Sequence, residues 1–464
     1  MSDSLGPAGS AQRANHEALI LRAQGKLGEA IAVLRAEIAR SRGVAQLHHN
    51  LGQLLEESSD LAGACGAYDA ALGLDPTFLP SLLARAACYA RQQAWDDAAG
   101  AYTRVLEVDP TSLQAHLALY EIEQIRGHAD RAVEHQRHAL TQQRLYSRRA
   151  PQERRRVLGL LAPGDWKANA PLELILPPEQ TTLHRLYVVG DEPQVKLDLP
   201  PVDVAFVAIG ESPAAVRPLR TAARVLRSLA IPAINEPRFV LRTNRMRLPR
   251  FLASIPNCVV APIALATRAM LLEGNMNMPF PVIVRPIGSH AGEGLERIDD
   301  ARALADYAAR MPQGTYYVST FIDYRSADGY YRKYRVILID GRPYPFHLAV
   351  SPNWMVHYYN SPMREQAWMR EEEARYLEGG GECNSAPILA TLRLIAKRLR
   401  LDYIGVDCAI DRDGRLVVFE ADPAIIVHLL DDPQLFGYKR GAIKNIFSAI
   451  ESMLDERAQT AAGN

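Results

Sequence analysis

Three acidic residues near the C-terminus could together hold a cation. One apolar stretch ends at Asp407, a second ends in Glu420-Ala421-Asp422, and residues 411–414 between them have the composition of a turn. The segment is therefore predicted to be a β-hairpin, with Glu420 and Asp422 on one face and Asp407 across from them. Clustered carboxylates suit Mg²⁺, which usually shares its ligands with nucleotide phosphates. The alternative is that the three acids end two solvated strands.

A strand that ends in a cation precedes a glycine-rich loop. Residues 281–286 read Pro-Val-Ile-Val-Arg-Pro and place Arg285 at the strand end, and residues 287–294 read Ile-Gly-Ser-His-Ala-Gly-Glu-Gly. The three glycines let backbone N–H groups approach phosphate oxygens, and Ser289 adds a hydroxyl donor. The spacing is neither that of a Walker A motif nor that of a dinucleotide-binding loop. A lone loop of this kind is usually a turn, but the strand cation and the acidic hairpin make the combination more specific.

Two further strands are predicted between the loop and the acidic hairpin. Residues 315–323 indicate a strand that breaks into a linker, and residues 333–344 indicate a second hairpin with Asp340-Gly341 as its turn. Arg335 falls on a buried strand of that hairpin and needs an anionic partner, for which a phosphate is well suited.

These elements, in this order, resemble the ATP-grasp superfamily, and most closely its glutathione-synthetase-like and RimK-like carboxylate–amine ligases. The similarity lies in residues 282–286, 288–294, 335–342, 405–407 and 419–422. The chain departs from that pattern at four positions. It has Arg285 for a lysine, Asp422 for an asparagine, and Thr320 and Lys333 where acids are usual.

The resemblance implies transfer of the γ-phosphate of ATP to a carboxylate, followed by attack of an amine on the acyl phosphate. Arg335 and Arg285 are the candidate catalytic residues, and Asp407, Glu420 and Asp422 are the candidate Mg²⁺ ligands. The candidate ATP-binding residues are Arg285, Gly288, Ser289, His290, Gly292, Gly294, Thr320, Phe321, Asp323 and Lys333.

Two other segments supply candidate substrate contacts. Residues 346–364 are rich in His, Tyr and Trp, and His347, His357 and Arg364 are candidates there, although packed or surface histidines are equally common. Upstream, ligands of a parallel α/β sheet lie beyond the carboxyl ends of its strands, which singles out Asp165 and Asn169. An ordinary loop is the alternative reading for these two.

The first third of the chain repeats itself with a period of 34 residues. The repeated small residues are Ala30, Ala64, Ala98 and Ala132. Pro76 and Pro110 each follow an alanine of this series by 12 residues and are expected to end the second helix of a pair. The pattern resembles the tetratricopeptide repeat, with about four units in residues 11–145 and an irregular first unit that carries Glu37 where a small residue is expected. Such a solenoid binds a peptide or protein partner or mediates self-association into a homo-oligomer.

Composition narrows the functional classes. Basic and acidic residues balance at 53 each, so the chain has no overall field that favours nucleic acid or an anionic membrane. No apolar stretch approaches the length of a membrane span, and the five cysteines are scattered without metal-ligand spacing. The N-terminus lacks the features of a secretory signal, so a cytoplasmic location is expected.

The middle of the chain changes to short apolar runs and helices. Strands are predicted at residues 157–162, 183–189 and 204–209, and an amphipathic helix at 216–229 with Ser212 as its N-cap. The arginine-rich segment between the repeats and these strands is expected to be a charged connecting helix.

The sequence therefore predicts a multidomain protein, in which an all-α tetratricopeptide solenoid precedes an α/β pre-ATP-grasp domain and an α+β ATP-grasp domain. The predicted parts are a disordered tail (1–10), the repeats (11–145), an arginine-rich linker (146–156), the pre-ATP-grasp domain (157–250), the ATP-grasp domain (251–457) and a second tail (458–464). The expected function is an ATP- and Mg²⁺-dependent ligase that joins a carboxylate to an amine.

Two alternative functions are also compatible with the sequence. One is an adaptor whose ATP-grasp part has decayed into a nucleotide sensor, which the residues at 285, 320 and 333 suggest and the three retained acids oppose. The other is a kinase-like or thioester-forming member of the same superfamily.

Overall fold

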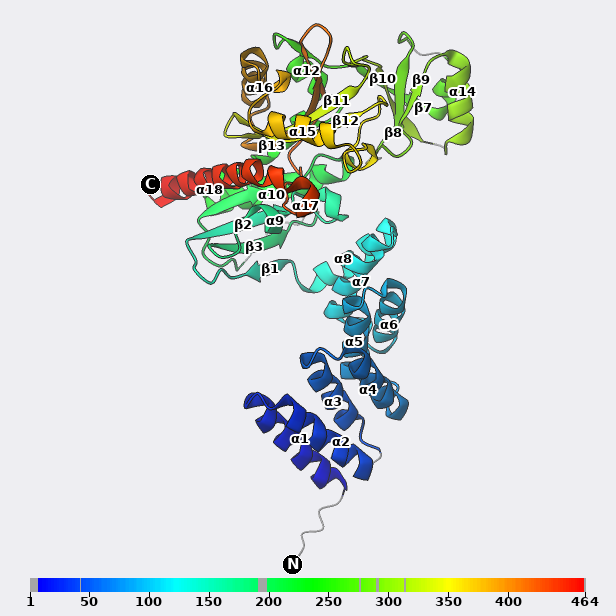
Figure 1. Ribbon diagram of the computed structural model, residues 1–464, viewed down its shortest axis with the longest axis vertical. Coiled ribbons are helices and arrows are strands. Elements are labelled where there is room, and N and C mark those ends of the chain that lie inside the picture. The colour runs from blue at the N-terminus through cyan, green and yellow to red at the C-terminus, as the bar shows by residue number, and fades with distance from the viewer. Residues whose placement is uncertain are drawn as a thin grey trace, which may run out of the picture. The chain divides into compact units, whose positions relative to one another are not determined.

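The chain folds into two compact units, Met1–Arg144 and Leu145–Asn464 (Figure 1). The computed structural model describes residues 7–41, 43–190, 198–274, 277–288, 292–312 and 314–462. The first unit is a helical repeat solenoid, and the second is a mixed α/β region with three sheets.

The first unit consists of consecutive antiparallel helix pairs. Its helices are α1 (Pro7–Ala23), α2 (Leu27–Arg40), α3 (Ala45–Glu57), α4 (Leu61–Leu74), α5 (Leu79–Arg91), α6 (Trp95–Val108), α7 (Leu113–Ile125) and α8 (Ala129–Gln142). The four alanines of the 34-residue period lie on the second helix of each pair and are completely buried. A methyl group at these positions lets the paired helices approach closely. The predicted helix ends are confirmed, because α4 and α6 stop two residues before Pro76 and Pro110.

The irregular first repeat has a buried, hydrogen-bonded polar residue in its core. Glu37 is buried where the other repeats are apolar, and its carboxylate accepts hydrogen bonds from the hydroxyls of Ser10 and Ser41, each at 2.6 Å. These two hydrogen bonds lower the pKa of Glu37 and satisfy its buried charge. The predicted tail at 1–10 is wrong for its last four residues, since α1 begins at Pro7.

The first sheet of the second unit has the strand order β1-β3-β2-β4-β5. Its strands are β1 (Leu145–Arg148), β2 (Arg155–Leu161), β3 (Thr181–Tyr187), β4 (Val204–Val207) and β5 (Ala233–Ile234). All neighbours pair in parallel except β1, which lies antiparallel to β3 at the edge. Helix α10 (Val216–Leu229) follows β4, and Ser212 accepts the Ala215 N–H at 3.1 Å as predicted for a cap.

The arginine-rich linker predicted at 146–156 is part of this sheet. β1 and the start of β2 lie within it, and the side chain of Arg155 is only 1% exposed. Arg155 contacts Asp455 at 3.1 Å on the C-terminal helix α18 (Arg440–Ala462). A buried guanidinium needs such a carboxylate, and an exposed connecting helix would not supply one. The predicted tail at 458–464 is likewise wrong up to Ala462, where α18 ends.

Two further sheets follow, with orders β7-β10-β8-β9 and β12-β11-β13-β14-β6. Their strands are β6 (Cys258–Val259), β7 (Ile263–Thr267), β8 (Val282–Pro286), β9 (Glu296–Ile298), β10 (Thr315–Thr320), β11 (Tyr331–Ile339), β12 (Arg342–Ser351), β13 (Tyr403–Ile410) and β14 (Leu416–Asp422). The remaining helices are α9 (Leu172–Ile175), α11 (Pro237–Val240), α12 (Leu248–Leu252), α13 (Arg268–Leu272), α14 (Ala301–Arg310), α15 (Ala367–Leu377), α16 (Ala386–Leu399) and α17 (Pro433–Phe436). Both predicted hairpins are confirmed, and Asp340 and Gly341 form the first turn with φ angles of 44° and 75°.

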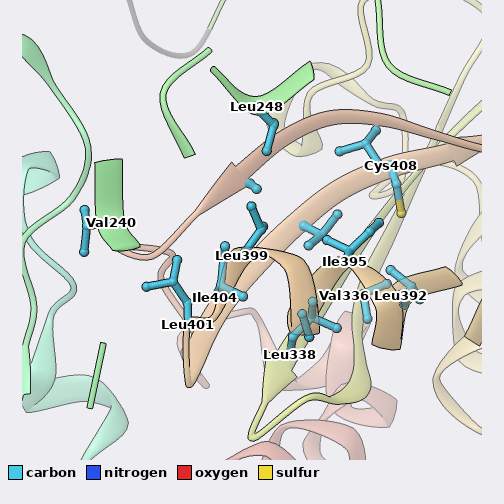
Figure 2. Close-up of a cluster of buried hydrophobic side chains, with 14 of the residues drawn as sticks. Val240, Leu248, Val336, Leu338, Leu392, Ile395, Leu399, Leu401, Ile404 and Cys408 are labelled. Atoms are coloured by element: carbon cyan, nitrogen blue, oxygen red, sulfur yellow. The ribbon is translucent and has the colours of Figure 1, made fainter. Parts of the chain in front are cut away.

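One hydrophobic core crosses the boundary predicted at residue 250. Figure 2 shows Leu392, Ile395 and Leu399 of α16 gathered with side chains of β11 and β13. The same cluster includes Leu158 and Leu160 of the first sheet. Because residues from both predicted domains bury one another, the two domains form a single compact unit. None of the described helices has the length and apolarity needed to cross a bilayer.

The packing of the repeats predicts opposite effects for two helical glycines. A methyl group at Gly52 in α3 would overlap the buried ring of Tyr68, whereas one at Gly66 in α4 would meet open space. Gly52→Ala should therefore lower the free energy of unfolding of the repeat unit by about 1–3 kcal/mol. The matched control Gly66→Ala should raise it by about 0.5–1 kcal/mol, since alanine loses less backbone entropy in a helix. Urea unfolding followed by circular dichroism would measure both, and equal effects would contradict this packing.

Candidate functional site

A cavity of about 370 Å³ lies between the second and third sheets of the second unit. Strands β7, β8 and β10 contribute one group of lining residues, and β11, β13 and β14 contribute another. The charged residues that line the cavity are Arg245, Arg285, Lys333, Arg335, Asp407, Glu420 and Asp422. The structure therefore brings both candidate catalytic arginines and all three candidate metal ligands to one cavity.

The strand register explains how these charges meet. His347 on β12 is paired with Arg335 on β11, Arg335 with Asp407 on β13, and Asp407 with Glu420 on β14. Directly paired residues in antiparallel strands project from the same face of the sheet. The four side chains consequently form one row across four strands, which we call the cross-strand row. The prediction that Asp407 lies opposite Glu420 is confirmed.

Asp407 is the most strongly held member of the row. Arg335 binds both of its oxygens, with Nε at 2.6 Å from Oδ1 and Nη2 at 2.9 Å from Oδ2, and the Nζ of Lys333 lies 2.7 Å from Oδ2. Burial alone would raise the pKa of Asp407, but the two cations outweigh it and hold that pKa well below its usual range. Lys333, predicted as an ATP contact, binds this carboxylate and also lines the cavity.

Glu420 and Asp422 show opposite electrostatic effects. Arg245 Nη2 lies 2.7 Å from Glu420 Oε2, and this cation overcomes burial to lower the pKa of Glu420. The Glu420 side chain stays 43% exposed because it opens into the cavity. Burial and then the charge of Glu420 raise the pKa of Asp422 to about 6. Asp422 therefore carries negative charge that its neighbours compensate poorly, which is a place where a cation would bind.

Arg285 reaches the cavity from the opposite sheet. It lies on β8, where it is paired with Tyr317 of β10, and both residues line the cavity. Burial, followed by repulsion from Arg245, lowers the pKa of Arg285 to about 10. Crowded cations of this kind favour a polyanionic ligand between them.

The glycine-rich loop is described only in part. Ser289 and His290 lie outside the described residues. Gly292 has a φ of 82° and lines the cavity, and Gly294 has a φ of 62°. A β-carbon at Gly294 would lie 2.8 Å from Cδ of Pro286, so glycine is required there for the loop to fold back on β8. Gly288 also has a positive φ but is not among the lining residues.

The end of β10 and the residues after it form an apolar wall of the cavity. Thr320 and Phe321, both predicted ATP contacts, line the cavity, and the Phe321 ring packs edge-on against Trp354 with 5.8 Å between centroids. Asp323, a third predicted ATP contact, is not among the lining residues and lies 3.5 Å from Arg325 instead.

The candidate substrate contacts separate into two groups. His357 lines the cavity, and burial lowers its pKa. His347 lies buried behind Arg335, burial keeps its pKa well below the usual value, and its Nδ1 has no hydrogen-bond partner among the described residues. Arg364 is exposed and lies 3.5 Å from Asp432, away from the cavity lining.

The two candidates on the first sheet have structural roles in this fold. Asp165 Oδ1 accepts the Lys167 N–H at 3.0 Å, which caps a short 3-10 helix. Asn169 brackets the end of β2, since its side chain exchanges two hydrogen bonds with the backbone of Ala162. Neither residue lines the cavity.

Sequence reasoning missed Arg245, the cation that binds Glu420. It lies in a basic stretch that also contains Arg242 and Arg247, and no local pattern distinguishes it from its neighbours. Trp354 and Met355, which also line the cavity, lie in the segment already noted for its aromatic residues.

The described carboxylates fit a metal ion only in part. No group of three His, Cys, Asp or Glu side chains in the described part of the chain gathers as ligands of one metal ion. Both oxygens of Asp407 are engaged by cations, whereas on β14 the Glu420 oxygen that Arg245 does not hold and the carboxylate of Asp422 present hard oxygen ligands two residues apart. The latter two fit Mg²⁺ best, and the Mg²⁺ site stays a prediction.

Comparison with known protein families and with curated proteins found no match. Among solved structures, that of MamA is 18% identical and covers 28% of this chain and 77% of its own, with a TM-score of 0.27. The first TPR of Spaghetti (RPAP3), bound to an HSP90 peptide, is 23% identical and covers 26% and 97%, with a TM-score of 0.25. A tetratricopeptide repeat protein from Parabacteroides merdae is 23% identical and covers 30% and 53%, with a TM-score of 0.27.

The helix pairs of the first unit, with the buried alanines of the 34-residue period, are the arrangement of a tetratricopeptide-like solenoid. The resemblance of the second unit to the ATP-grasp superfamily stays a prediction.

The Asp407 ion pairs predict a pH-dependent cost of removing Arg335. Because these pairs depress the pKa of Asp407, their stabilisation is present above the unfolded pKa and is lost as pH falls through and below it. Arg335→Met should cost about 3 kcal/mol of unfolding free energy at pH 7, since only Lys333 then compensates the buried carboxylate. The deficit should stay nearly constant down to about pH 4 and shrink as the pH falls below that value.

Urea unfolding at several pH values would measure this deficit. Arg342→Met, on the exposed start of β12, serves as the control and should change stability by less than about 0.5 kcal/mol at every pH. A deficit for Arg335→Met that does not change with pH would show that packing, and not charge, is its contribution.

Proposed function

We propose that the second unit is an ATP-dependent carboxylate–amine ligase of the ATP-grasp type. The observation that carries this proposal is the arrangement of charges in the first cavity. Arg285 enters the cavity from the second sheet, and Lys333 and Arg335 lie beside Asp407 and Glu420 on the third sheet. Two sheets that enclose a strand cation, a glycine-rich loop and a carboxylate hairpin are the arrangement that the sequence resemblance implies.

The cations suit the binding of a triphosphate. Phosphoryl transfer requires positioning and charge neutralisation more than a covalent catalyst. Arg285 and Lys333 would hold the phosphates from opposite sides, and the bidentate guanidinium of Arg335 would turn from Asp407 to a phosphate oxygen. The apolar wall of Phe321 and Ile322 offers a surface for the base. When bound, Mg²⁺ would neutralise phosphate charge, with Glu420 and Asp422 as the residues that hold it.

The reaction would proceed in two displacements. A carboxylate oxygen of the first substrate attacks the γ-phosphorus, the bond to the β-phosphate oxygen breaks, and ADP leaves. The nitrogen of an amine then attacks the acyl carbon, inorganic phosphate leaves, and the amine loses a proton. His357 lines the cavity with a lowered pKa, so it is neutral at pH 7 and can accept that proton.

A nucleotide-sensing adaptor is the second candidate function. The contact that favours it is the Lys333–Asp407 ion pair, because the resemblance places an acid where this chain has Lys333. A permanent pair would keep Asp407 away from any metal ion. Such a protein would bind ATP without consuming it.

An isosteric substitution that removes one charge from the cavity distinguishes these two functions. Glu420→Gln removes a carboxylate from the proposed metal site and should lower ATP turnover at least ~100-fold. Phosphate release would be measured with Mg²⁺ over a panel of amino acids and peptides, and the products identified by mass spectrometry. Asp413→Asn, in the exposed turn of the same hairpin, is the matched control and should retain full activity. ATP binding without turnover in the unmodified protein would favour the sensor.

We also propose that the repeats capture a peptide or protein that carries one of the two substrate groups. The repeat structure of RPAP3 was determined with a bound HSP90 peptide. YrrB, another TPR protein among the similar structures, is described as having an unusual peptide-binding site. Tethering a bound chain to the ligase unit would raise its effective concentration at the cavity to about the millimolar range.

A truncation tests this capture. The second unit begins at Leu145, and β1 at its start is paired with β3. Residues 145–464 are therefore the appropriate fragment, because a cut further along the chain would remove β1 from the sheet. The fragment should bind ATP as the full chain does and use the peptide acceptor with a raised KM and an unchanged kcat. Equal KM values for the fragment and the full chain would show that the repeats serve assembly.

A further inference from the structure

A second cavity, of about 460 Å³, lies at the opposite end of the strands that carry the cross-strand row. Its lining includes Asp340, at the β11–β12 turn, and Asp402, immediately before β13. Arg335 lies five residues before Asp340 on the same strand, which is a separation of about 17 Å. The cavity is therefore distinct from the proposed ligase site, and its volume is in the range of small-molecule pockets.

Three cations line this second cavity from one face of α16 and its end. Arg393 and Lys397 are spaced by four residues, so they lie one above the other on the helix surface, and Arg400 follows as the left-handed C-cap residue of α16. All three are exposed, and within the described ranges none of them forms an ion pair. We call them the basic triplet. The opposite face of α16 is held in the core by Leu392, Ile395 and Leu399 (Figure 2).

The carboxylates of the same cavity already have other partners. Asp340 and Asp402 both bind Arg457, at 2.6 and 3.1 Å. Glu236 binds Arg238 at 2.6 Å. Arg457 thus compensates one of the two charges of Asp340 and Asp402, and Arg238 compensates Glu236. The three positive charges of the triplet exceed the one negative charge that remains on the cavity wall.

Two guanidinium groups lie close to the same aromatic ring, that of Phe239, in the wall of the cavity. The guanidinium groups of Arg400 and Arg242 each lie 4.4 Å from the ring centroid of Phe239. Burial and then the charge of Arg400 lower the pKa of Arg242. Like charges spaced by four residues on a helix repel each other. The negative end of the helix dipole accounts for Lys397 in the last turn, but Arg393 lies a full turn earlier.

We propose that this second cavity binds a small anion that carries two or more phosphate or carboxylate groups. Two such groups match the spacing of cations along successive turns of α16, and charge-assisted hydrogen bonds would remove the repulsion within the triplet. A small ligand fits better than a nucleic acid because the cavity is bounded by a turn and a helix end, and the whole chain has no net charge to attract a long polyanion.

The test is calorimetric titration of the full-length protein with tripolyphosphate and, separately, with citrate. The double variant Arg393→Gln/Lys397→Gln should bind the preferred anion at least about tenfold more weakly, since two charge-assisted contacts are lost. Arg398→Gln is the matched control. It removes one charge from the same helix end but does not line the cavity, so its affinity should stay within about twofold of the unmodified protein.

Further measurements separate this site from the proposed ligase site. The KM for ATP and the rate of ATP turnover at the first cavity should be the same in the double variant and the unmodified protein, because neither Arg393 nor Lys397 lines that cavity. Preference for tripolyphosphate or for citrate would identify phosphate or carboxylate as the natural group. Unchanged anion affinity in the double variant, or an equal loss in Arg398→Gln, would overturn the proposal.

Discussion

The buried carboxylate of Asp407 is the constraint on which the second unit depends. Only 5% of this residue is exposed, and an ionised group at such a depth is stable only with cations bound to it. Lys333 and Arg335 supply these cations. They lie two residues apart on β11, so both side chains are on the face of the sheet that carries Asp407. A slip of one residue between β11 and β13 would turn these cations to the opposite face and leave the carboxylate uncompensated. The ion pairs therefore specify the strand register as well as the local charge.

That register also determines which charges border the first cavity. The row continues from Asp407 to Glu420, which Arg245 holds from outside the sheet. Each carboxylate in the row is thus paired with a cation that a phosphate could also bind. Asp422, at the end of β14, lacks such compensation, and burial together with the charge of Glu420 raises its pKa. An ATP–Mg²⁺ pair would bring a polyanion to the cations and a cation to the acids, which satisfies both sets together.

The same strands connect two chemically different ends of the unit. β11 and β13 carry the proposed nucleotide cations and acids at one end and Asp340 and Asp402 at the other. Between the two ends, Ile337, Leu338 and Ile404 are buried in the core. A packed interior of this kind transmits small displacements with little compression. The two cavities consequently lie at opposite ends of the same two strands, with packed core residues between them.

The sequence by itself determined the features that depend on neighbours along the chain. The 34-residue alanine period defined the helix pairs because close packing within each repeat needs a small residue at one position. Apolar runs bounded by turns likewise located β8, both hairpins and the pairing of Asp407 with Glu420. Arg335 was identified as a cation in need of an anion, although its partner in the structure proved to be a protein carboxylate.

Only the tertiary structure decided which distant groups meet. Arg245 is indistinguishable from nearby arginines until the fold places it against Glu420, 175 residues away. Arg155 is predicted to be solvated by its basic surroundings, but Asp455 on α18 buries it. The boundary at residue 250 disappears because side chains from both predicted domains share one core. Long-range ion pairing and core packing are properties of three-dimensional proximity, and local composition carries no record of them.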